Sequence, residues 1–121
     1  MIHSSHRFHG HNSLKYVYHN GQTVRGPLTS MKYIVNTRRS TYRMSVVVSK
    51  KVNKSAVARN RIRRRLYEAA RQHESQIVRP YDIVVTVFSD NVLGLSGAEV
   101  QRLVSAQLKQ AGILSPSPAA A

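Results

Sequence analysis

The residues most suited to chemistry in this chain are arginines. Five of the seven residues from Arg59 to Arg65 are arginine, within a segment that reads AVARNRIRRRLYEAAR over residues 56–71. Ser55 and the alanines behind it are typical of the start of a helix. Cations near a helix N-terminus cost roughly 0.3–1 kcal/mol each, whereas guanidinium groups and free helix amides both bind phosphate. The placement therefore favours a phosphate-bearing partner.

The charge distribution points the same way. The formal net charge is +14, and fifteen Lys or Arg precede the first acid, Glu68, after which four cations face five acids. A charge run usually carries interleaved acids on a solvated surface, but the basic run from 50 to 65 contains none. This pattern indicates a nucleic-acid site, with a simple localisation or heparin-type patch as the alternative. The eight cations of the run are Lys50, Lys51, Lys54, Arg59, Arg61, Arg63, Arg64 and Arg65.

The sequence offers little for catalysis by the chain itself. Its five carboxylates show no spacing that suggests a shared site, and no catalytic triad or phosphate-loop pattern occurs. We therefore predict no catalytic residue. The histidines near the start could chelate a metal, but a solvated tail is the preferred interpretation, and His73 is expected to pack. The absence of cysteine excludes disulfides and thiolate zinc sites.

One domain is expected from the length of 121 residues. Residues 1–12 are predicted to be a flexible His-rich segment, 13–114 the folded domain, and 115–121 a disordered tail. No apolar run is long enough to cross a membrane, and the first twenty residues lack the apolar core of a signal peptide. The sequence predicts a cytoplasmic protein.

Periodicity predicts the order α-β-β-α-β-α and a two-layer α/β (α+β) sandwich. The helices are expected at 13–21, 56–77 and 94–112. Strands at 28–36 and 41–50 are expected to pair as a hairpin across the turn TRRS, and the apolar strand 81–89 suits the centre of the sheet. The apolar stripe of the long helix is expected to face the sheet through Ile62, Leu66, Ala69, Ala70 and Ile77.

The choice between DNA and RNA depends on context. Strands flank the basic helix and no heptads follow it, which disfavours helix-turn-helix and zipper readers of DNA. Aromatic side chains could stack on unpaired bases, which favours RNA. The candidates for stacking are Tyr16, Tyr18, Tyr33 and Tyr42.

The segment SKK at 49–51 followed by AVARNRIRRRLYEA at 56–69 resembles the signature of the protein component of bacterial ribonuclease P. The similarity extends to an early Arg7-Phe8 pair, the first helix, the strand 82–87 and a final helix, and so covers nearly the whole chain. Tyr18 matches an aromatic position of the family's first helix, while Leu14 stands where the family usually has Phe. The family's glycine after the lysine pair has no clear equivalent here.

The resemblance implies a fold like the second domain of ribosomal protein S5, with a left-handed βαβ crossover through the long helix; general rules favour the right-handed form. It implies a subunit that joins a catalytic RNA and promotes Mg²⁺-dependent removal of the 5′ leader from precursor tRNA, the Mg²⁺ being held mainly by the RNA. No obligate protein partner or membrane is implied. The alternative is a structural RNA-binding protein of the same fold without an enzymatic partner.

The resemblance also assigns roles to residues. A cleft for the leader would be lined by Leu14, Tyr18 and Tyr33. The catalytic RNA would be bound by Lys50, Lys51, Lys54, Arg59, Asn60, Arg61, Arg63 and Arg64.

Overall fold

The computed structural model describes residue 6 and residues 11–114, with backbone only at 11 and 12. The predicted disordered tail at 115–121 lies outside the described residues. So does the predicted flexible start at 1–12, except for residue 6 and the helical residues 11 and 12. Short 3₁₀ turns, η2 (Glu74–Gln76) and η3 (Asp90–Gly94), follow α2 and β4. The helices and strands are α1 (His11–Asn20), β1 (Gln22–Arg25), β2 (Thr29–Val35), β3 (Arg43–Val47), α2 (Ala56–Arg71), β4 (Tyr81–Val87) and α3 (Gly97–Ala111).

The four strands form one sheet in the order β1-β2-β4-β3. β4 runs antiparallel to β2 and parallel to β3, so it is central, as predicted. The predicted hairpin between β2 and β3 is wrong, because β4 lies between them. β4 is buried on both faces, and such a strand gains most from an interior position. The four-residue β1 was not predicted.

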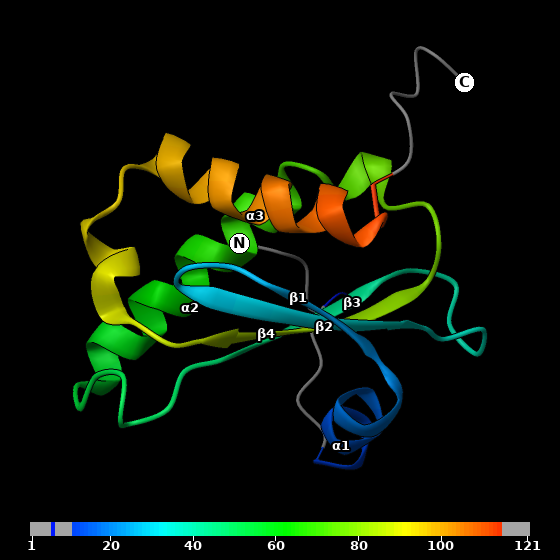
Figure 1. Cartoon of the computed structure of the whole chain (residues 1–121), viewed down its shortest axis with the longest axis horizontal. Coiled ribbons are helices and arrows are strands. Elements are labelled where there is room, and N and C mark those ends of the chain that lie inside the picture. Colours follow the sequence, from blue (N-terminus) through cyan, green and yellow to red (C-terminus); the bar gives the residue numbers. More distant parts are fainter. Residues whose placement is uncertain (1–5, 7–10, 115–121) are drawn as a thin grey trace.

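Helices lie on both faces of this sheet. α2 and α3 cover one face, as the two-layer prediction requires, and α1 lies alone against the other, which a two-layer sandwich does not include (Figure 1). Side chains of β4 alternate accordingly: Ile83 and Val85 join the main core under α2 and α3, whereas Val84 is buried with Val17 of α1. α2 connects the parallel neighbours β3 and β4, so the predicted βαβ unit is present; its left-handed sense stays a prediction.

α2 begins as predicted and ends earlier than predicted. The Ser55 hydroxyl accepts a hydrogen bond from the amide of Ala58 at 3.2 Å and caps the helix. The helix stops at Arg71, so its predicted extension to Ile77 is wrong, although Ile77 is buried. Sixteen helical residues span about 24 Å, which matches the roughly 23 Å of a seven-residue strand such as β4. A longer helix would overshoot the sheet to which the chain must return.

Arg65 belongs to the packing of the fold. Its guanidinium donates hydrogen bonds to the carbonyl oxygens of Val92 at 2.7 Å and Leu93 at 3.0 Å, and to that of Leu95. These carbonyls belong to η3 and to the residue that follows it. Arg65 therefore ties α2 to the connection between β4 and α3, and its charge is used inside the protein.

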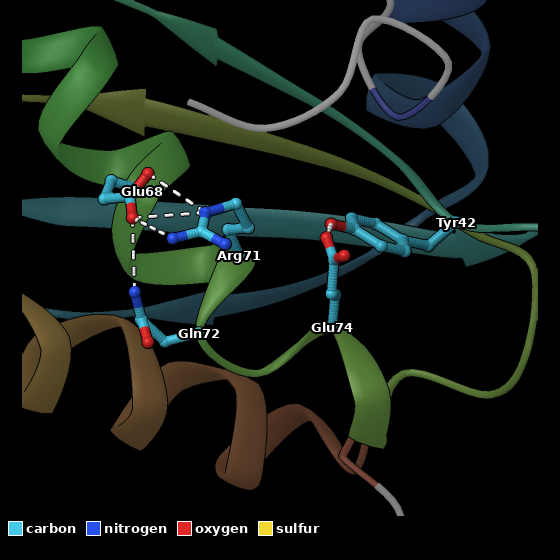
Figure 2. A network of polar contacts seen from close by, with 5 residues as sticks. All are labelled: Tyr42, Glu68, Arg71, Gln72 and Glu74. Atoms are coloured by element: carbon cyan, nitrogen blue, oxygen red, sulfur yellow. Dashed lines mark hydrogen bonds and ion pairs between the residues drawn. The ribbon is translucent and has the colours of Figure 1, made fainter.

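A polar network closes the C-terminal end of α2 (Figure 2). Glu68 forms an ion pair with Arg71 at 2.5 Å, and hydrogen bonding from Arg71 lowers the pKa of Glu68 to about 2. The hydroxyl of Tyr42 donates a hydrogen bond to Glu74 at 3.0 Å. Tyr42 is only 2% exposed, and this burial, with the Glu74 contact, raises its pKa well above the ordinary value.

We expect replacement of Arg65 by Met to lower the free energy of unfolding by about 2 kcal/mol. The reason is that the three carbonyl oxygens in and after η3 would lose their charged hydrogen-bond donor. The adjacent Arg64 is exposed and provides the matched control. Its replacement by Met should change stability by no more than about 0.5 kcal/mol. Urea denaturation of both variants measures the difference. Equal effects of the two substitutions would contradict the assigned role of Arg65.

Tyr42 should make stability depend on alkaline pH. Its folded-state pKa is raised, so its contribution is fully present below pH 10 and declines as the pH rises above the unfolded-state value. Between pH 8 and pH 11 the wild-type chain should lose about 1 kcal/mol more unfolding free energy than Tyr42→Phe. Urea denaturation at the two pH values tests this. An identical loss in both proteins would show that the phenol is not held neutral by the fold.

Candidate nucleic-acid interface

The loop between β3 and α2 is held by its own side chains. Asn53 accepts a hydrogen bond from the amide of Ser55 at 2.9 Å and donates one to Asp90 at 3.2 Å. Arg59 donates to the carbonyl oxygens of Asn53 and Lys54, both at 2.9 Å. No residue other than glycine has positive φ in the described chain, so this loop needs no glycine. It presents three exposed cations: Lys50, Lys51 and Lys54.

The arginines of α2 divide into two kinds. Arg59 and Arg63 are half-buried, and Arg63 donates a 2.6 Å hydrogen bond to Asn60. Arg61 and Arg64 are exposed, and neither forms a hydrogen bond or ion pair with the rest of the chain that the structure describes. This division follows from the helical period, because Arg59 and Arg63 flank the predicted apolar stripe, whereas Arg61 and Arg64 lie on the side of the helix away from it.

All five carboxylates of the chain have partners elsewhere. Glu68, Glu74 and Asp90 contact Arg71, Tyr42 and Asn53, as described above. Glu99 accepts a hydrogen bond from the amide of Ser96 at 2.9 Å, and Asp82 is buried against Arg43. Within the described residues no three potential ligands gather around a metal position. None of these carboxylates forms a hydrogen bond or ion pair with Arg61 or Arg64 in the part of the chain that the structure describes.

The opposite face of the sheet carries two of the three residues assigned to the leader cleft. Leu14 packs against the buried pair formed by Val17 and Val84. The Tyr18 hydroxyl lies 3.4 Å from the hydroxyl oxygen of Thr86, and Tyr18 as a residue is 39% exposed. α1 thus holds an apolar and an aromatic side chain over β4, with the aromatic one accessible.

The prediction that Tyr33 shares this cleft is wrong. Tyr33 pairs in register with Ile83 and packs with the core under α2 and α3, on the face away from α1. Its hydroxyl donates a hydrogen bond to Gln22, and its ring meets Tyr81 edge-on at 6.2 Å. Tyr42, another candidate for stacking, is buried.

A polar pocket that the sequence did not indicate lies beside the start of α1. Asp82 accepts two hydrogen bonds from Arg43, at 2.8 and 2.9 Å, and a third from Asn36 at 2.9 Å. These residues line a cavity of about 360 Å³ together with Ser13 and Tyr16. Both oxygens of the Asp82 carboxylate accept hydrogen bonds. The Arg43–Asp82 ion pair therefore lines this pocket as a structural element, and the carboxylate does not act as a free acid.

The helices that the structure describes are all too short or too polar to cross a bilayer.

Comparison with known proteins points to one family. The protein-family model named Ribonuclease P matches residues 2–112. The ribonuclease P protein component of Pseudanabaena sp. is 38% identical over 87 residues, which are 72% of this chain and 75% of that protein. The component of Chloroflexus aurantiacus is 36% identical over 98 residues, covering 81% and 70%.

Solved structures agree in fold. The ribonuclease P protein of Staphylococcus aureus superposes with a TM-score of 0.80 at 24% identity, covering 91% of this chain and 98% of that one. The protein of Thermotoga maritima gives 0.76 at 20% identity, covering 86% and 96%. At these identities the structural likeness shows the fold, while the match over residues 2–112 and the sequence relatives show the family. The chain belongs to the ribonuclease P protein family.

Proposed function

We propose that this chain is the protein subunit of ribonuclease P and binds the catalytic RNA through the loop at 50–54 and the outward side of α2. The observation that supports this most is the exposure of Arg61 and Arg64 without counter-charge in the described chain. A phosphate backbone supplies that charge, and arginine binds it bidentately. The lysines of the loop extend the same surface toward the carboxyl end of β3.

The other three proposed RNA-binding residues, Arg59, Asn60 and Arg63, hold this surface in shape. Arg59 fixes the loop carbonyls, and Arg63 holds Asn60. One hydrogen-bonding nitrogen of each arginine is committed inside the protein, and the rest of the guanidinium is available to RNA. Of the eight proposed RNA-binding residues, we therefore assign charge presentation to Lys50, Lys51, Lys54, Arg61 and Arg64, and a combined role to Arg59, Asn60 and Arg63.

We further propose that the face carrying α1 takes the single-stranded 5′ leader of precursor tRNA. Leu14 offers an apolar contact and the exposed ring of Tyr18 a stacking surface. Both lie on the sheet face opposite α3, away from the core that contains Tyr33. Leader contacts on one face and RNA contacts from α2 would let one small domain touch substrate and catalytic RNA together.

The chemistry in this proposal belongs to the RNA. Every carboxylate of the chain already has a protein partner, so we assign the Mg²⁺ ions required for endonucleolytic cleavage to the RNA subunit. The protein would contribute binding and charge neutralisation. A cytoplasmic location and the lack of an obligate protein partner remain predictions.

A reconstitution separates this function from its alternative, a structural RNA-binding protein without an enzymatic partner. The chain is mixed with a bacterial ribonuclease P RNA and precursor tRNA at low Mg²⁺, and the rate of leader removal is measured. We expect faster cleavage with the protein than with RNA alone, because its cations relieve phosphate repulsion. A rate unchanged by the protein would favour the structural alternative.

Replacement of Arg61 by Gln should weaken binding to the RNA subunit and reduce the slope of log affinity against log salt by about one, as expected when one phosphate contact is lost. Arg102→Gln removes the same charge from an exposed position on α3 and is the matched control. Titration of each variant over a salt series measures both effects. The assignment of Arg61 fails if the two substitutions change the slope equally.

A further inference from the structure

One large apolar side chain next to the proposed RNA surfaces is not used by the core. Phe88 follows β4 directly and is 50% exposed, although its neighbour Val87 is buried. Its amide donates a hydrogen bond to the carbonyl of Leu28 at 2.8 Å, so its backbone is fixed against the start of β2. Phe88 is therefore held at the end of a central strand with half of its side chain in water.

Strand alternation places Phe88 on the face that carries α1. Val85 and Val87 face the main core, while Val84 lies on the α1 side and Thr86 meets the Tyr18 hydroxyl. Phe88 is the next residue in the second series, two positions beyond Thr86. It therefore continues the row that begins with the exposed aromatic ring of Tyr18.

Phe88 also adjoins the basic surface. Two residues further on, Asp90 accepts the hydrogen bond from Asn53 that ties this connection to the loop at 50–54. The carboxyl end of β4 lies at the end of the sheet where α2 and α3 begin (Figure 1). An RNA strand leaving the α1 face toward the cations of α2 would pass this position.

Resting on the function proposed above, we propose that Phe88 is a stacking residue for an unpaired nucleobase of the precursor leader, at the junction between the α1 face and the basic loop. The ring carries no hydrogen-bonding group, and every base has a flat face, so this contact would tolerate any base. Tyr33 was expected to supply a second aromatic surface for the leader. With Tyr33 on the other face, Phe88 is suited to that role, in addition to the exposed Tyr16 and Tyr18 of α1.

The test uses the reconstituted holoenzyme and precursor tRNAs that carry a leader of several nucleotides or of one nucleotide. Phe88→Ala should weaken binding of the long-leader precursor about tenfold, the equivalent of one stacked base. Binding of the one-nucleotide precursor and of the RNA subunit should stay unchanged. Phe88→Trp should retain affinity. Val78→Ala is the control, because Val78 is also exposed but precedes β4 at its other end.

Single abasic substitutions along the leader then locate the contact. At one position, removal of the base should weaken binding to the wild-type holoenzyme but not further weaken binding to Phe88→Ala. Additive losses at every position, an equal loss with the short leader, or a loss of affinity for the RNA subunit would each overturn the proposal. These results differ from failure of the proposed function itself, in which the wild-type chain would not accelerate cleavage at all.

Discussion

The rest of the structure depends on α2 having to pack and to carry charge at once. Ile62 and Leu66 are completely buried against the sheet. The side chains of the neighbouring arginines must therefore lie on the flanks of the helix or on its side away from the sheet. Arg59 and Arg65 turn to backbone carbonyls, which need donors. Arg61 and Arg64 have no such partner among the described residues and are exposed to solvent. Like charges three or four residues apart on a helix repel by roughly 0.2–0.5 kcal/mol per pair, so the free chain carries a stability cost that an RNA backbone would remove.

The acidic residues of the chain do not relieve this repulsion between arginines. Glu68 lies on α2 itself, yet it pairs with Arg71 toward the C-terminal end, where Figure 2 also shows Glu74 bound to Tyr42. Asp90 is near the basic loop but is hydrogen-bonded to Asn53. The fold thus uses its few carboxylates to shape connections and caps, and leaves the outward side of α2 positive. This arrangement suits a protein that completes its electrostatics on assembly.

The sequence was sufficient where a side chain's role follows from local periodicity, and insufficient where it depends on the arrangement of elements. Periodicity placed Ile62 inside, and the apolar run of β4 indicated a central strand. Alternation could not show that β4 inserts between β2 and β3, since strand pairing is non-local. Tyr33 was assigned to the wrong face for the same reason: its alternation was clear, but which helix covers which face was not. The exposure of Phe88 was not predicted, because Phe88 ends a continuous apolar run. Strand alternation could still have placed it on the same face as Thr86, two residues earlier.

The central claim is that Arg61 and Arg64 destabilise the free protein because their counter-charge lies on another molecule. The most direct measurement is the unfolding free energy of the wild-type chain and of the double variant Arg61→Gln, Arg64→Gln, by urea denaturation at low salt and near 1 M salt. At low salt the double variant should be more stable by about 0.5–1 kcal/mol. The gap should close at high salt, where the screening length is only about 3 Å. A double variant that is less stable than wild type, or a gap that does not depend on salt, would contradict the account.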